Sequence, residues 1–103
     1  MNYDILISKK AEDDLREIYQ YISEILLSPE NAERQLYRLE TAIMNLRQFP
    51  KRYKLYQEQL WHRKELRVMP IDNFLIFCIS NDDENIVTIL RVMYSKRNIP
   101  TEL

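Results

Sequence analysis

The chain has 103 residues, a length that predicts one domain spanning residues 1–103 with a single modest core. Apolar residues make up 46% and charged residues 30%, and no continuous apolar run approaches the ~18 residues of a membrane span. Residues 1–50 carry six Lys/Arg against nine Asp/Glu, and residues 51–103 carry nine against seven, which is well short of the basic surface of a general nucleic-acid binder.

Glycine is absent, and this excludes several kinds of site. Phosphate-binding P-loops, dinucleotide-binding turns and GxSxG nucleophile elbows all need glycine where backbone approaches closely or turns sharply. Backbone positions with positive φ should therefore fall to Asn or Asp, as in the cluster at 81–85.

Cysteine and histidine each occur once, which does not favour a zinc site, and we expect no metal and no cofactor. Cys78 lies in the apolar run NFLIFCI and should be a buried, inert thiol. The N-terminus mixes charges too early for a secretory signal. We therefore expect a cytoplasmic protein with no membrane partner.

The first half of the chain predicts a strand and two helices. Residues 3–7 form the strand, and Ser8 fits the N-cap of the first helix. Its apolar face consists of Ala11, Leu15, Ile18, Tyr19, Ile22 and Leu26. Ser28 and Pro29 fit the N-cap and first position of the second helix, which ends at Phe49-Pro50. Its apolar face consists of Ala32, Leu36, Leu39, Ile43 and Leu46. Joined by a tight turn, the two predict a helical hairpin.

Residues 50–63 are polar and irregular, and they predict a loop rather than a core element. Tyr53, Tyr56 and Trp61 stand there among several cations. These aromatic side chains either stack on bases or anchor the loop onto the core. His62 is a candidate acid or base by residue type, but without a second histidine nearby we expect an ordinary surface residue.

Three strands follow, at 65–69, 74–79 and 86–93, with short links that predict an antiparallel meander. The order strand, helix, helix, strand, strand, strand predicts an α+β fold with the helical hairpin on one face of a four-stranded sheet. The last strand offers apolar side chains to both faces. One helical layer leaves the second face open, either to a partner or to a second copy in a homodimer.

Three segments, in the correct order, resemble the RelE/ParE superfamily of toxins. They are ISKKAEDDLREIYQYI at the first helix, KELRVMPIDNFLIFCI across a strand–turn–strand, and ILRVMYSKRNI at the end. In the last of these, Tyr94 stands where the ParE type has His, and Asn98 stands where it has Asp.

The resemblance implies the toxin of a type II toxin–antitoxin pair, of the plasmid stabilisation type, which a cognate antitoxin neutralises. RelE-like members cut mRNA on the ribosome, whereas ParE-like members poison DNA gyrase. The nuclease branch carries an Arg at about the position of Phe74, and ribosome-directed toxins are usually strongly basic. Both departures favour the gyrase-directed branch. The alternatives are a ribosome-dependent mRNA endonuclease and a non-toxic partner-binding domain.

Candidate site residues follow from these alternatives. If the chain is a nuclease, the phosphodiester chemistry needs a base, an acid and stabilising cations, and the candidates are Arg67, Arg91, Tyr94, Lys96 and Arg97. Candidates for contact with antitoxin or target are Lys51, Arg52, Lys54, Arg67, Arg91, Tyr94 and Arg97. We expect an antitoxin helix or strand across the open apolar face, with acidic side chains that meet Arg67 and Arg91.

For Arg91 and Arg67, a purely structural role is the alternative to a role in binding or catalysis. By period-2 alternation, Arg91 shares a face with Val87, Ile89 and Met93, where it either forms a structural ion pair or acts in a groove. Arg67 shares a predicted face with Glu65 and is either a surface charge or a cation on the open face.

Overall fold

The computed structural model describes residues 2–96, apart from the side chains of residues 59 and 60. Its five strands are β1 (Asp4–Ile7), β2 (Lys54–Leu55), β3 (Arg67–Ile71), β4 (Phe74–Asn81) and β5 (Ile86–Tyr94). Its α-helices are α1 (Lys9–Gln20), α2 (Pro29–Asn45) and α3 (Gln59–Arg63), and a 3-10 turn spans Pro50–Arg52. The strands form one sheet in the order β1-β5-β4-β3-β2, with β1 parallel to β5 and all other pairs antiparallel.

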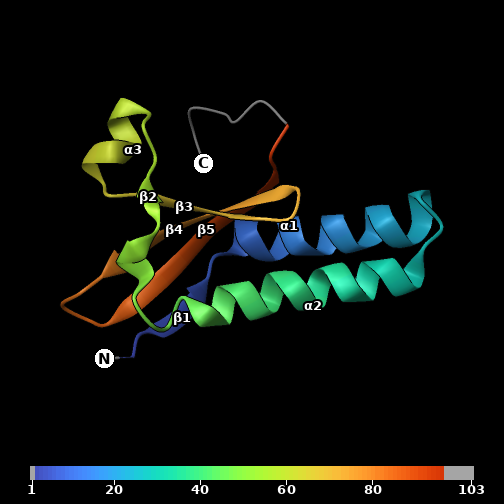
Figure 1. The fold of residues 1–103 in the computed structure, drawn as a ribbon, viewed down its shortest axis with the longest axis horizontal. Coiled ribbons are helices and arrows are strands. Elements are labelled where there is room, and N and C mark those ends of the chain that lie inside the picture. The colour runs from blue at the N-terminus through green and yellow to red at the C-terminus, as the bar shows by residue number, and fades with distance from the viewer. Residues whose placement is uncertain (1, 97–103) are drawn as a thin grey trace.

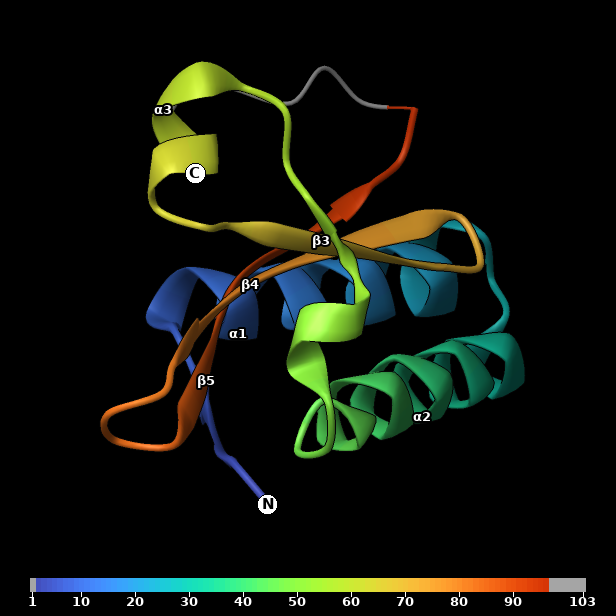
Figure 2. The ribbon, with the colours of Figure 1, turned by 60° about the vertical axis from the view of Figure 1, so that its left-hand side comes forward.

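The predicted helical hairpin is confirmed, and α1 and α2 cover one face of the sheet (Figure 2). Ser8 caps α1, because its Oγ accepts a hydrogen bond from the Ala11 backbone N–H at 3.1 Å. The same Oγ donates to the Leu90 carbonyl at 2.9 Å, which ties the helix start to β5. Pro29 occupies the first position of α2, as predicted. Between the two helices, α1 continues as a π-helical turn, Tyr21–Ile25.

The main core lies between this hairpin and the sheet. The helices contribute Ala11, Leu15, Leu39, Ile43 and Leu46, and the strands contribute Met69, Ile76, Cys78, Val87, Ile89 and Val92. All these side chains are buried. Burial raises the pKa of the Cys78 thiol to about 11, so the thiol is protonated and unreactive at neutral pH, as the sequence predicts.

The expectation that the second sheet face is open is wrong for its central part. Leu66, Phe77 and Met93 are buried there in a second cluster, against Tyr56 and Trp61 of the segment that contains α3. Figure 2 shows α3 on the side of the sheet opposite to the helical hairpin. The 50–63 segment, predicted as a loop, therefore contains β2 and α3 and covers the second face, and its aromatic side chains act as anchors.

The three strands of the meander are confirmed, and β2 is an additional strand at the sheet edge, so the predicted four-stranded sheet has five strands. β3 begins two residues later than predicted because Glu65 has a φ of 57° and cannot belong to a strand. Asp72 and Asn85 take positive φ as expected. Leu27, Phe49 and Glu65 do so as well, and this contradicts the expectation that only Asn and Asp would.

Asp72 connects the β3–β4 turn to α2. Its carboxylate accepts two hydrogen bonds from Arg38, both at 2.8 Å, and one from Gln35 at 3.0 Å. These donors, Arg38 first, lower the pKa of Asp72 below its ordinary value. A carboxylate with a lowered folded-state pKa stabilises the fold above its unfolded pKa of about 3.9, and this contribution is lost as the pH falls through the folded-state pKa.

We therefore expect the variant Asp72→Asn to lose less stability than the parent between pH 7 and pH 3. Asn tolerates the positive φ of this turn, so the substitution removes the charge and leaves the backbone in place. Thermal unfolding midpoints of both proteins at the two pH values measure the effect. Equal losses of midpoint on acidification would show that Asp72 contributes nothing to the acid response.

Candidate partner-binding site

A groove opens between the far half of α1 and the end of the sheet where β4 begins and β5 ends. Its volume is about 590 Å³. Apolar and aromatic side chains form most of its walls, and they include Ile18, Tyr21, Ile22, Leu26, Phe74 and Tyr94. Asp14 and Glu17 supply carboxylates on the helical side. An apolar groove with a few charged groups is a common form of binding site.

An ion pair between Asp14 and Arg91 borders this groove. The Asp14 carboxylate accepts from Arg91 Nε at 2.7 Å and from Arg91 Nη2 at 2.8 Å, and it also accepts from the Val92 backbone N–H at 2.9 Å. The side chains are only 8% and 16% exposed. The hydrogen bond to Asp14 raises the pKa of Arg91. Arg91 therefore forms the structural ion pair, one of its two expected roles, and joins β5 to α1.

A β-bulge explains why the predicted face assignment fails at Met93. Phe77 pairs with Arg91 and Cys78 pairs with Ile89, so Leu90 is an extra residue in β5. One extra residue reverses the alternation beyond it. Met93 therefore lies in the second cluster, on the face opposite to Ile89, and not on the shared face that strict alternation predicts.

Tyr94 and Lys96 lie at the exit of β5, as expected. Tyr94 borders the groove, is 43% exposed and packs edge-to-face on Phe74 with ring centroids 5.9 Å apart. Lys96 is exposed. The predicted site residue Arg97, and Asn98 of the end motif, lie outside the described residues.

Arg67 lies away from the exit of β5 and binds backbone carbonyls of the chain instead. Its Nη1 donates to the carbonyls of Lys51 at 3.1 Å and Tyr53 at 2.9 Å, so it holds the segment that precedes β3. It cannot share a strand face with Glu65, because β3 begins at Arg67. Arg67 pairs with Cys78, and Tyr94 pairs with Phe74 four residues away on β4, which separates the two by about 13 Å along the strands.

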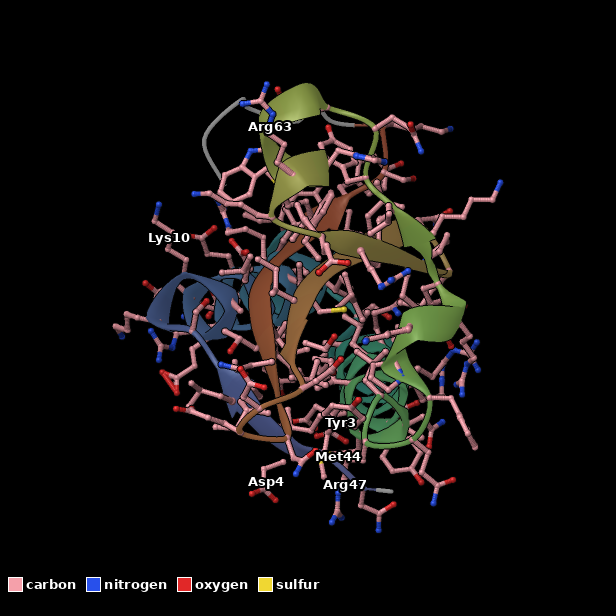
Figure 3. All side chains as sticks on the ribbon, turned by 90° about the vertical axis from the view of Figure 1, so that its left-hand side faces the viewer. Tyr3, Asp4, Lys10, Met44, Arg47 and Arg63 are labelled. Carbon is pink, nitrogen blue, oxygen red and sulfur yellow. The ribbon has the colours of Figure 1, made fainter. Side chains whose placement is uncertain are left out.

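The cations at 51–54 form local contacts and do not border the groove. Lys51 pairs with Asp82, which also accepts from the Tyr3 hydroxyl at 2.9 Å. Arg52 donates to the Gln48 carbonyl at 3.1 Å and lies over the Tyr53 ring, 4.9 Å from its centroid. Lys54 is exposed on β2. Other arginines are also far apart, because Figure 3 shows Arg63 on α3 and Arg47 at the opposite end of the molecule.

The predicted nuclease residues therefore do not converge among the described parts of the chain. Arg91 is paired within the fold, Arg67 is bound to backbone carbonyls, and Tyr94 and Lys96 stand together at the β5 exit. His62 is exposed on α3, as expected of a surface residue. Within the described residues, no group of three His, Cys, Asp or Glu side chains is placed to hold a metal ion. None of the described helices is long and apolar enough to span a bilayer.

Sequence reasoning missed the groove and its carboxylates, although one signal was present. Asp14 stands within the apolar stripe of the first helix, between Ala11 and Ile18, at helical spacing. A carboxylate on the buried face of a helix needs a partner, and Arg91 is the cation within an apolar strand. The pairing of these two anomalies was predictable, whereas the groove depends on how far α1 extends beyond the sheet.

The fold and the groove define a class, which is a small α+β domain with a helical hairpin on an antiparallel-rich sheet. A sequence model described as "ParE toxin of type II toxin-antitoxin system, parDE" matches residues 5–99, and the chain belongs to this family of toxins. Among solved structures, the chain is similar to one from "Chromosomal ParDE TA system from P. aeruginosa". The TM-score is 0.75 at 18% identity, with 91% of this chain and 97% of that chain covered.

It is also similar to a chain of the toxin–antitoxin complex RelBE2 from Mycobacterium tuberculosis. Here the TM-score is 0.64 at 19% identity, with 91% of this chain and 99% of that chain covered. At these identities the two structures support the fold. A search of curated proteins gave no match.

Proposed function

We propose that this toxin arrests growth in the manner of the ParE branch, by binding DNA gyrase and trapping it on cleaved DNA. The family match over residues 5–99 is the observation that carries the proposal. On this proposal the chain is a binding poison and supplies no catalytic group of its own. It acts in the cytoplasm, where its target works.

The arrangement of the cations supports this branch. In-line cleavage of RNA needs an acid, a base and cations around one phosphate. Arg91 is committed to Asp14, and the apolar Phe74 stands where the resemblance to the nuclease branch would require Arg. Cleavage of mRNA is the second candidate, because Tyr94 and Lys96 are both exposed at the exit of β5, where a phenol and an ammonium group are available to contact a phosphate.

We propose further that the groove beside Tyr94 receives the cognate antitoxin. An antitoxin segment there would bury Tyr94 and the apolar wall formed by Ile18 and Ile22. Neutralisation then follows directly, because the bound segment covers the same exposed residues that would contact the target. This location replaces the open sheet face that the sequence predicted, since α3 covers the centre of that face.

Expression of the chain without its antitoxin tests the function. We expect growth arrest with an increase in gyrase–DNA cleavage complexes, and no new breaks in ribosome-bound mRNA. Tyr94→Ala should reduce the arrest at least tenfold, whereas Tyr37→Ala, an exposed tyrosine on α2 outside the groove, should leave it unchanged. mRNA breaks without DNA breaks would contradict the gyrase branch. Normal growth of cells that contain the folded chain would contradict the toxin function itself.

A further inference from the structure

The far end of the helical hairpin is an exposed apolar surface. Figure 1 shows α1 and α2 running past the edge of the sheet, so their distal turns have no strand beneath them. The side chains there are exposed to different extents, with Tyr21 at 55%, Ile25 at 67%, Leu26 at 55% and Leu27 at 81%. We call these four residues the hairpin tip. Tyr21 and Leu26 also line the groove, so the tip and the groove form one continuous apolar track.

The backbone of the tip is held in an unfavourable conformation that displays these side chains. Leu27 has a φ of 53°, a region that costs a bulky residue about 1 kcal/mol. The Leu26 and Ser28 N–H groups donate to the carbonyls of Tyr21 and Ile22, both at 3.0 Å, and these bonds fix the turn. Asn or Gly would fit this position better, so the leucine at the most exposed point has no role in the stability of the turn.

The helical side of the track is acidic, because Asp14 and Glu17 line the groove there, whereas the exposed Lys96 lies with Tyr94 at the β5 end. Between Arg16 and Arg34 the sequence contains no Lys or Arg, and it contains four glutamates, Glu17, Glu24, Glu30 and Glu33. All four are exposed. Within residues 2–96 no ion pair involves any of them. The track is therefore an apolar stripe with an acidic border along the helical hairpin.

This charge selects the occupant. A second copy of the chain would bring glutamates against glutamates, and an anionic membrane would repel them in the same way. Cations on a partner would instead pair with the border while its apolar residues cover the stripe. The sequence predicted an acidic partner that would pair with Arg67 and Arg91. Such a partner would find neither guanidinium group free, because both are bound within the chain.

We propose that the antitoxin segment in the groove is a basic amphipathic helix that continues over the hairpin tip as far as Leu27. This inference rests on the proposed function, which assigns the groove to the antitoxin. The chain from Asp14 to Leu27, through α1 and its π-helical turn, covers thirteen residue steps, or about 20 Å if each step rises by the 1.5 Å of an α-helix. The occupant thus needs about four helical turns, with Lys or Arg on both sides of its apolar face.

Two synthetic 18-residue peptides test the charge. Both carry the same leucine stripe, and one has Lys and the other Glu along the borders of the stripe. Fluorescence anisotropy with the purified full-length chain should give at least tenfold tighter binding of the Lys peptide, and the difference should shrink as salt is raised. Equal binding of the two peptides, or tighter binding of the Glu peptide, would overturn the proposal.

Three variants test the location. Glu17→Gln with Glu24→Gln should weaken Lys-peptide binding at least threefold, whereas Glu12→Gln with Glu40→Gln should leave it unchanged. The control pair removes the same charge from a shallow groove on another side of α1. Leu27→Asn should weaken binding at least fivefold without lowering the thermal midpoint, because Asn accepts the positive φ. An equally large loss of peptide binding in the control pair, or no loss in Leu27→Asn, would exclude the track as the binding site of the peptide.

Three further measurements separate this inference from its rivals and from the proposed function. Stronger binding to phosphatidylglycerol vesicles than to the Lys peptide, or a dimer that Leu27→Asn dissociates, would overturn it in favour of a membrane or a second copy. Growth arrest on expression does not involve the peptide. Arrest with failed peptide binding would refute the basic helix alone, whereas normal growth would refute the proposed function.

Discussion

Replacement of Asp14 with alanine should lower the free energy of unfolding by about 3 kcal/mol. The variant leaves the Arg91 guanidinium without its partner at a site where its side chain is only 16% exposed. It also leaves the Val92 backbone N–H, inside β5, without its acceptor. Chemical denaturation at neutral pH measures the loss.

Asp13 supplies the matched control, because it lies next to Asp14 on α1 but its side chain is 43% exposed. Its pairs with Lys9 and Arg16 lie on the surface, where such pairs contribute about 0.5 kcal/mol or less. If Asp14→Ala cost no more than Asp13→Ala, the Asp14–Arg91 pair would not be the link between α1 and β5 that we describe.

Replacement of Phe77 with alanine should cost about 3 to 4 kcal/mol and should release the segment that contains α3. Phe77 is fully buried at the centre of the second cluster and packs edge-to-face with Tyr56 at 5.3 Å between ring centroids. Denaturation gives the stability loss. Hydrogen exchange of the backbone amides of residues 56–66 should report the release as faster exchange than in the parent.

Phe49→Ala provides the comparison, since Phe49 is 72% exposed and belongs to neither core cluster. Its effect should stay within about 0.5 kcal/mol. Unchanged exchange across residues 56–66 in Phe77→Ala would mean that α3 does not depend on the second cluster, and the central part of this sheet face would then be covered by other contacts.

Local patterns predicted most of the main elements of the fold. Apolar residues at helical spacing predicted α1 and α2, and Ser8 and Pro29 predicted where each begins. The segment containing α3 was not predictable in the same way. Its anchors Tyr56, Trp61 and Leu66 recur at five-residue steps, which match neither a helix nor a strand. They pack only because the sheet offers a second apolar face.

The candidate site depended on two features that alternation and turn rules do not capture. One is the extra residue Leu90, which places Met93 on the opposite face from the one predicted. The other is the turn at Leu27, where a leucine adopts positive φ although no turn rule favours it. Both features depend on tertiary contacts. The Ser8–Leu90 contact accompanies the extra residue in β5, and the packing of α1 against α2 accompanies the turn at Leu27.

The proposed poisoning of gyrase is tested most directly with purified components. The chain, added to gyrase, ATP and supercoiled plasmid, should produce linear DNA when detergent traps the cleaved complex and protease then digests the attached gyrase, and Tyr94→Ala should produce much less. If the chain left gyrase and its DNA unchanged while the same preparation cut ribosome-bound mRNA, the gyrase mechanism would be contradicted and the nuclease alternative would replace it.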